Sequence, residues 1–244
     1  MIWYPSIPLQ VLTVSESKTR LDQRLVTLGL APSRSQAENF IKLGFIKLNG
    51  KIINKSGYLV SVSDKIELTT SDKYVSRAAL KLKSVAEKLK INFKNMIVLD
   101  VGSSTGGFTD FALQHGARKV IAVDVGTNQL HPSLLTDDRI ELHEKTDIRD
   151  INKLSTFPDI VLIDVSFISI NEILPHVAKL INKNSIIVAM VKPQFEAGSS
   201  FKHKGVIKND NIRRQILREF ELSAKKLFKI IDKADSEVSG AKGN

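Results

Sequence analysis

The chain has 244 residues, of which 42% are hydrophobic and 25% charged, so it has enough apolar material for one medium-sized core and a smaller module. Lysine and arginine number 36 against 26 aspartate and glutamate residues. The resulting formal net charge of +10 favours a polyanionic partner, with nucleic acid ahead of an anionic membrane surface. The absence of cysteine excludes disulfides, thiolate metal sites and cysteine nucleophiles, including those of cysteine-dependent cytosine C5 methylation.

Residues 1–17 form a rather apolar leader, which we expect to be disordered. Pro5 and Pro8 interrupt it and no basic residue precedes Lys18, so it is a poor signal peptide. No stretch of the chain approaches the roughly 20 apolar residues that span a bilayer. The sequence therefore predicts a soluble, cytoplasmic protein without a membrane partner.

Residues 18–68 are predicted to form a small α+β module. Leu21, Leu25 and Leu28 recur at helical spacing and indicate a short first helix. Ser33 and Gln36 are a capping-box pair at the start of a second helix. The alternating apolar residues that follow flank Asn49-Gly50, a pair that favours a tight hairpin turn.

This module is also strongly basic, because the stretch from Lys18 to Lys55 has eight basic residues and two acidic ones. Phosphate contact is one use of such an imbalance, and a solvated basic surface is an equal alternative on charge alone. The segment RLDQRLVTLGLAPSRSQAENFIKLGFIKLNGKII, however, resembles the "S-four" RNA-binding domain of a small-subunit ribosomal protein, pseudouridine synthases and tyrosyl-tRNA synthetases. We expect the RNA-binding residues to be Arg20, Arg24, Arg34, Lys42, Lys47 and Lys51.

After a linker of residues 69–73, residues 74–244 alternate helical stretches with continuous apolar runs. The five runs are residues 96–102, 119–125, 139–145, 159–167 and 185–195. Helices are predicted within residues 109–115, 171–181 and 211–226, and Leu227–Val238 is expected to lead into a sixth strand. Strands that are apolar on both faces belong in a parallel sheet covered by helices, so the fold class is a doubly wound, Rossmann-like α/β sheet preceded by the small α+β domain.

A glycine-rich turn follows the first of these strands, and Asp124 closes the second. Such a turn lets a ligand approach the backbone, and a strand-end carboxylate can accept both hydroxyls of a ribose. The combination indicates a nucleoside cofactor without identifying it, and the alternative is a tight turn with helix-capping aspartates such as Asp100. The expected cofactor-binding residues are Gly102, Ser103, Ser104, Thr105, Gly106, Gly107, Phe108, Asp124 and Asp147.

Three further polar residues are expected to meet at the same edge of the sheet. Lys81 lies in a helix before the sheet, Asp164 ends the fourth strand and Lys192 ends the fifth. The carboxyl ends of parallel strands converge on one crevice, so two lysines and a carboxylate can form a basic substrate site. Taken singly, each is more often a solvated or capping side chain.

Six motifs of the larger domain support a family resemblance. They are YVSRAALKL, DVGSSTGGFTD, AVDVG, IDVSFIS, VKPQFEAG and KGVI. Together they resemble the TlyA-type rRNA 2'-O-methyltransferases, often called hemolysin A, whose catalytic domain is similar to the FtsJ (RrmJ) fold. The resemblance implies methyl transfer from S-adenosylmethionine to ribose 2'-hydroxyls of ribosomal RNA, on cytidines in the known members, with ribosomal RNA or ribosomal subunits as the partner.

The family carries a Lys-Asp-Lys-Glu tetrad, and Lys81, Asp164 and Lys192 match its first three positions. The family's glutamate follows a Gly-Asn pair in the final strand, whereas this chain stops at Gly243-Asn244. Glu237 precedes that pair and is not assigned the role. Either the chain lacks its final strand, or this member works without the fourth group.

The resemblance makes Lys192 the candidate base and Asp164 the residue that holds a lysine and the hydroxyl in position. A nicotinamide dehydrogenase is the competing enzyme, but the turn is not G-x-G-x-x-G. Base N6 methylation would need prolines after Asp164. An RNA-binding protein with a catalytically weak domain, or a hemolysin, is the non-enzymatic alternative. The histidines lack metal-ligand spacing, so no metal is expected. Phe195–Gly205 is a candidate lid or RNA contact, or a plain surface loop.

Overall fold

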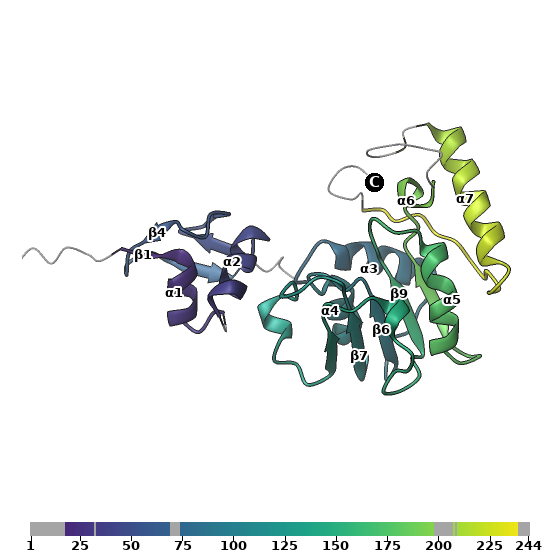
Figure 1. The fold of residues 1–244 in the computed structure, drawn as a ribbon, viewed down its shortest axis with the longest axis horizontal. Helices are drawn as coiled ribbons and strands as arrows, with labels where there is room; N and C mark the ends of the chain where they lie inside the picture. Colours follow the sequence, from purple (N-terminus) through teal and green to yellow (C-terminus); the bar gives the residue numbers. More distant parts are fainter. Residues whose placement is uncertain (1–17, 32, 69–73, 198–206, 208, 239–244) are drawn as a thin grey trace, which may run out of the picture. The chain divides into compact units, whose positions relative to one another are not determined.

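The computed structural model describes residues 18–31, 33–68, 74–197, 207 and 209–238 (Figure 1). Its contacts divide the chain into two units, Met1–Leu68 and Thr69–Asn244. The leader, the linker 69–73 and most of the loop Phe195–Gly205 lie outside the described residues. Within the described residues, no helix has the length and apolar character needed to cross a membrane.

The smaller unit packs two helices against short antiparallel strands. Its helices are α1 (Leu21–Thr27) and α2 (Arg34–Lys42), and its strands are β1 (Thr19–Arg20), β2 (Ile46–Leu48), β3 (Lys51–Ile52), β4 (Leu59–Val60) and β5 (Ile66–Leu68). β1 pairs with β4, while β2 lies between β3 and β5. Leu21, Leu25, Phe40 and Ile41 are fully buried and form the core, whereas Leu28, predicted on the same apolar face, lies just after α1 and is 45% exposed.

Two local predictions in this unit are confirmed. The Ser33 hydroxyl accepts a hydrogen bond of 3.3 Å from the Gln36 amide, which caps α2. Asn49 and Gly50 have φ of 50° and 80° and join β2 to β3, as a tight hairpin turn requires. The sequence signals for this unit were strong because each is a short-range geometric requirement.

The larger unit is built on a five-stranded sheet in which every strand is parallel, as predicted. Its strands are β6 (Ile97–Val101), β7 (Lys119–Val123), β8 (Ile140–His143), β9 (Ile160–Ile163) and β10 (Ile186–Ala189). The order across the sheet is β10-β9-β6-β7-β8. The strands from β6 to β8 extend the sheet to one side, and β9 and β10 extend it to the other, so the strand order reverses between β6 and β9. Ligands of doubly wound sheets bind beside the carboxyl ends of the strands at such a switch point.

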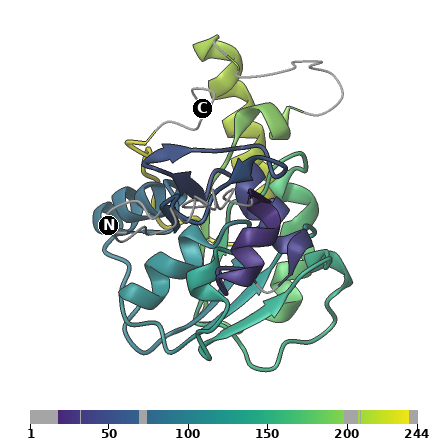
Figure 2. The same ribbon diagram turned by 90° about the vertical axis from the view of Figure 1, so that its left-hand side faces the viewer.

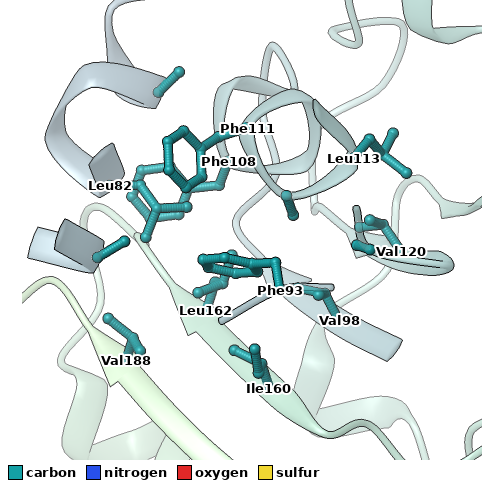
Figure 3. Packing of buried hydrophobic residues seen from close by; sticks show 14 of the residues in the cluster. Leu82, Phe93, Val98, Phe108, Phe111, Leu113, Val120, Ile160, Leu162 and Val188 are labelled. Carbon is teal, nitrogen blue, oxygen red and sulfur yellow. The ribbon is translucent and has the colours of Figure 1, made fainter. Parts of the chain in front are cut away.

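Helices cover both faces of this sheet. They are α3 (Ala78–Lys88), α4 (Gly107–Gln114), α5 (Ile170–Leu180) and α7 (Asp210–Ala224), with single turns η1 (Pro132–Leu134), η2 (Ile148–Asp150) and α6 (Pro193–Glu196). Val98 and Leu162 point toward Leu82 of α3 and Phe111 of α4 (Figure 3). Their neighbour Leu99 packs on the opposite face, in the cluster that holds the buried sides of α5 and α7. α5 and α7 lie side by side on that face (Figures 1 and 2).

The predicted sixth strand in Leu227–Val238 is wrong, because no strand is present among the described residues after α7. Phe228 and Ile230 pack into the cluster of α5 and α7. Farther on, Glu237 pairs with Lys88 of α3 at 3.1 Å, and Lys88 also donates to a main-chain oxygen of the tail. The tail therefore uses its side chains to contact helices and adds no strand to the sheet.

Candidate active site and nucleic-acid interface

The turn between β6 and α4 brings the backbone close to its neighbours at two glycines. Gly102 has φ +83°, and a Cβ there would lie 3.1 Å from the carbonyl oxygen of Asp164. Gly106 has φ +85° and is the N-cap of α4, where a Cβ would lie 2.5 Å from Leu134 Cδ1. Positive φ and close packing both require glycine, so the turn holds the β9 loop close to β6.

Asp124 lies directly after β7 and organises the same turn. Its carboxylate accepts hydrogen bonds from the Ser104 amide at 2.8 Å and from the Gly126 amide at 2.6 Å. The Ser104 hydroxyl also donates to Gln129 at 3.2 Å. Because a carboxylate has about four acceptor positions, Asp124 retains capacity for the hydroxyls of a ribose.

Asp147 is held beside the turn by a neighbouring arginine. Its side chain caps η2 through the Arg149 amide, and the Arg149 guanidinium contacts both of its oxygens at 3.0 and 2.7 Å. This pairing holds the pKa of Asp147 below its usual range. Asp147 is therefore an oriented anion at the edge of the site.

A pocket of about 380 Å³ gathers the predicted cofactor and catalytic elements. Gly102, Ser104, Asp124, Asp147 and Asp164 all line it. It lies beside the carboxyl ends of β6, β7 and β9, which is the position expected for a ligand of this fold.

Other predicted cofactor residues do not line this pocket. Ser103, Gly106, Gly107 and Phe108 are buried, and Phe108 belongs to the core between the sheet and α3. The Thr105 carbonyl accepts a hydrogen bond from the main-chain amide of a residue in the turn before η1. These residues shape the turn from behind, and a direct cofactor contact by any of them stays a prediction.

Asp164 and Lys192 meet at the ends of β9 and β10, as expected from their strand positions. Lys192 Nζ lies 2.7 Å from Asp164 Oδ1, although the angles of this contact are not those of a hydrogen bond. Nζ donates instead to the Val165 carbonyl at 2.8 Å and to the Ser166 hydroxyl at 3.1 Å. The two side chains are only 16% and 14% exposed, so the pair is largely shielded from water; Asp164 lines the pocket, whereas Lys192 does not.

Lys81 lies on α3 and is partly buried. Among the described residues, its side chain makes no hydrogen bond or ion pair, and it does not line the pocket. The contacts of Lys192 Nζ are instead with Asp164, Val165 and Ser166. A meeting of the two lysines in the active site therefore stays a prediction.

Asp100 is a further site residue, which the sequence identified only as a possible cap. It is fully buried, and its Oδ2 accepts a hydrogen bond of 2.7 Å from the Thr109 hydroxyl. Burial raises the pKa of Asp100 to about 7, and the nearby charges of Asp164 and Asp124 add to this rise. Among the described residues, its Oδ1 and the buried hydroxyl of Ser103 lack hydrogen-bond partners. The glycine turn thus holds unused polar groups, as a ligand site does.

Phe167 is the functional candidate that the sequence analysis missed. It lines the pocket, is 93% exposed and has φ +70°, a conformation that is uncommon outside glycine. Its ring centroid lies 5.3 Å from that of Phe195. The available signal was that the fourth apolar run continues to Phe167, four residues beyond the last residue of β9.

A buried carboxylate organises the predicted RNA-binding arginines of the smaller unit. Asp22 is 0% exposed and accepts hydrogen bonds from Arg20 Nη2 at 2.7 Å and Arg34 Nε at 2.9 Å. The two guanidinium groups hold the pKa of Asp22 far below its usual range. The arginine side chains are 39% and 52% exposed, so they are fixed at one end and open to solvent.

The remaining predicted RNA-binding residues are also accessible. Lys42 and Lys51 are exposed, while Arg24 and Lys47 are partly exposed. Their contact with RNA stays a prediction. Within the part of the chain that the structure describes, no group of three or more histidine, aspartate or glutamate side chains could hold a metal ion.

Comparison with known proteins gives two family models, the S4 domain over residues 19–66 and the FtsJ-like methyltransferase over residues 74–244. Hemolysin A of Brachyspira hyodysenteriae is 40% identical over 92% of this chain and 96% of the relative. The 23S rRNA (cytidine-2'-O)-methyltransferase TlyA of Campylobacter jejuni is 40% identical over 79% of this chain and 76% of the relative.

A solved structure of a hemolysin-named protein from Streptococcus thermophilus is 36% identical, with a TM-score of 0.69 over 94% of this chain and 86% of that chain. The FtsJ-like range contains the parallel sheet and the residues that line the pocket, and the S4 range contains both helices of the smaller unit. The chain belongs to the FtsJ-like methyltransferase family and carries an S4 domain on the N-terminal side of its catalytic domain.

Proposed function

We propose that the protein transfers a methyl group from S-adenosylmethionine to ribose 2'-hydroxyls of ribosomal RNA, with cytidine as the target nucleoside. The observation that carries this proposal is the Asp164–Lys192 pair at the edge of the pocket built by the glycine turn and Asp124. The name of the Campylobacter relative supports the same substrate and position. A ribosomal RNA substrate implies a cytoplasmic site of action.

The pocket fits the cofactor on its own geometry. Its volume of about 380 Å³ lies within the range of small-molecule sites, and Gly102 allows close approach to the backbone. We assign Asp124 to the ribose hydroxyls of the cofactor. Asp100 Oδ1, in β6, and the Ser103 hydroxyl, in the turn, lack partners among the described residues, but both are buried and neither residue lines the pocket. When bound, S-adenosylmethionine supplies a methyl group that its positive sulfur has already activated.

Asp164 and Lys192 then have to position the nucleophile and manage its proton. Because the methyl group is already activated, alignment supplies a large part of the rate acceleration. The Val165 carbonyl, the Ser166 hydroxyl and Asp164 fix the Lys192 ammonium from three sides. The Lys192 ammonium cannot accept a proton, so we assign its neutral amine, formed once Lys192 has released a proton, to receive the proton of the 2'-hydroxyl. We assign Asp164 to the orientation of Lys192. Lys81 adds positive charge from α3.

RNA recognition involves both units. Sequence-specific recognition of RNA commonly stacks an unpaired base on an aromatic ring, and Phe167 offers an exposed ring at the pocket. In the S4 domain, Arg20 and Arg34 offer oriented guanidinium groups to phosphates. The partner is therefore ribosomal RNA, free or within ribosomal subunits.

The test is methyl transfer from labelled S-adenosylmethionine to ribosomal RNA, with ribose methylation mapped by nucleotide. Lys192→Ala and Asp164→Ala should each lower turnover by about 100-fold or more, because each removes a group that acts on the hydroxyl. Lys179→Ala, which removes an exposed lysine of α5, is the matched control and should leave turnover unchanged.

Three outcomes would contradict the proposal. Selective binding of NAD over S-adenosylmethionine would favour the dehydrogenase. Methylation of a base instead of a ribose would overturn the assigned substrate atom. Tight RNA binding without turnover by the wild-type chain would favour the RNA-binding protein with a catalytically weak domain.

A further inference from the structure

The turn after β10 is fastened to the loop after β9 by a partly buried carboxylate. We infer that Glu196 is a positioning residue of the active site, which sets the loop from Asp164 to Ser169 against Lys192. The inference rests on the proposed function, because it assigns Glu196 a role in that reaction. Glu196 is not one of the predicted catalytic residues Lys81, Asp164 and Lys192.

The contacts of Glu196 are directed at the far end of the loop. Its Oε2 accepts a short hydrogen bond of 2.5 Å from the Ser169 hydroxyl, and its Oε1 accepts one of 2.9 Å from the Ile170 amide. Ser169 is the N-cap of α5, and its hydroxyl in turn accepts from the Asn171 amide. Glu196 therefore binds the loop at its last residue, where α5 begins.

Two other residues of the turn after β10 contact the rest of the loop. Lys192 donates to the Val165 carbonyl and the Ser166 hydroxyl at the near end. In the middle, the ring of Phe195 contacts that of Phe167. The two segments are thus matched along their lengths, from Lys192 at one end to Glu196 at the other.

The middle of the loop needs such support. Phe167 has φ +70° and an almost fully exposed ring, so neither backbone preference nor burial holds it in place. A strained conformation persists only where its surroundings impose it. If Glu196 releases Ser169, the loop keeps the contacts of Lys192 and Phe195 but is no longer held at its far end, and both Phe167 and the contacts of Lys192 lose their fixed geometry.

A role confined to stability makes a different prediction. Loss of the Glu196 contacts also weakens the start of α5, so a lower melting temperature alone would not distinguish the two roles. Asn209→Ala offers a matched control, because Asn209 caps α7 through the Asn211 and Ile212 amides. It removes a comparable cap without touching the loop.

The experiment compares Glu196→Ala, Glu196→Gln and Asn209→Ala in the full chain. We expect Glu196→Ala to lower kcat on ribosomal RNA by about 10- to 100-fold, the effect of a displaced reacting group, while affinity for S-adenosylhomocysteine is unchanged. Glu196→Gln should recover most of kcat, because the amide can accept from Ile170 and donate to Ser169. Asn209→Ala should lose melting temperature but keep kcat.

A second measurement tests whether Glu196 holds the loop in place, and it does not depend on turnover. The chain has one tryptophan, Trp3, so a Phe167→Trp reporter in a Trp3→Phe background is observed alone. Its fluorescence anisotropy should fall when Glu196→Ala is added and be retained with Glu196→Gln or Asn209→Ala.

Equal kcat for Glu196→Ala and Asn209→Ala at matched stability, or an unchanged anisotropy, would overturn the inference. If the wild-type chain does not methylate ribosomal RNA, the proposed function fails. The anisotropy then still decides whether Glu196 holds the loop.

Discussion

Each unit of the protein contains a fully buried aspartate, and the two differ in charge. Asp22 of the S4 domain contacts Arg20 and Arg34, which hold its pKa far below the usual range. Asp100 of the methyltransferase domain accepts hydrogen bonds from Thr109, and burial raises its pKa to about 7. At Asp22 the two guanidinium groups outweigh the desolvation that burial causes, whereas at Asp100 burial is the largest effect.

The largest expected effect is a pH dependence of the methyltransferase domain. Because the pKa of Asp100 is raised from 3.8 to about 7 in the folded protein, its stabilising contribution is complete below pH 3.8 and is lost as the pH rises toward 7. The free energy of unfolding should fall over this range by up to roughly 4 kcal/mol.

Urea unfolding at a series of pH values, followed by hydrogen exchange in peptides of β6, measures this effect. The difference between the wild type and Asp100→Asn isolates the contribution of Asp100 from those of the other titratable groups. A difference that does not change with pH would show that Asp100 is ionised in the folded protein.

Asp22→Asn should destabilise the S4 domain by about 2 kcal/mol, because it removes charge-assisted hydrogen bonds while both arginines remain partly solvated. The pH dependence should have the opposite sign to that of Asp100. Since the folded pKa of Asp22 is lowered, its contribution is present above its ordinary pKa and is lost as the pH falls. Hydrogen exchange in peptides of α1 and α2 measures the loss of stability. Equal protection in the wild type and in Asp22→Asn would contradict this prediction.

The arginines held by Asp22 should have a smaller effect, on RNA affinity. Arg34→Ala should weaken ribosomal RNA binding by about 1 kcal/mol and reduce the salt dependence of binding by about one phosphate contact. Fluorescence titrations at several salt concentrations measure both. Lys183→Ala removes an exposed lysine of the other unit and serves as the control. An identical salt slope in the wild type and Arg34→Ala would exclude Arg34 from the interface.

The smallest effect is expected where the same type of ion pair is exposed. Lys88 and Glu237 are 41% and 69% exposed, so solvent screens their attraction. A double-mutant cycle with Lys88→Ala and Glu237→Ala should give a coupling of less than about 0.5 kcal/mol. A coupling as large as the loss in Asp22→Asn would contradict the view that shielding makes the Asp22 pairs strong.

The parallel sheet could be predicted from sequence because strands buried on both faces appear as continuous apolar runs. The ends of the strands could not. The fourth run continues to Phe167, whereas β9 ends at Ile163, because the chain leaves the sheet there to bring Asp164 to Lys192. The tail was predicted as a strand from its apolar residues, but Phe228 and Ile230 are used to pack against helices.

The active site could likewise be predicted only in part from the sequence. Asp164 follows β9 directly and Lys192 lies three residues after the neighbouring strand β10, so their meeting follows from topology. The charge of Asp100 and the exposure of Phe167 depend on groups distant in sequence, such as Phe195, and no local pattern encodes them.

The order of strands in the sheet also has a consequence for synthesis of the protein. β6 lies in the middle of the sheet, between β7 and β9, so its second neighbour is made some sixty residues after it. Parallel pairing over such a separation is slow, whereas the hairpin of β2 and β3 forms from adjacent residues. During translation the S4 domain can therefore fold as soon as it emerges, while β6, with β7 on one side, waits with its other edge unpaired. A nascent chain paused before β9 would be the stage at which this protein most needs a chaperone.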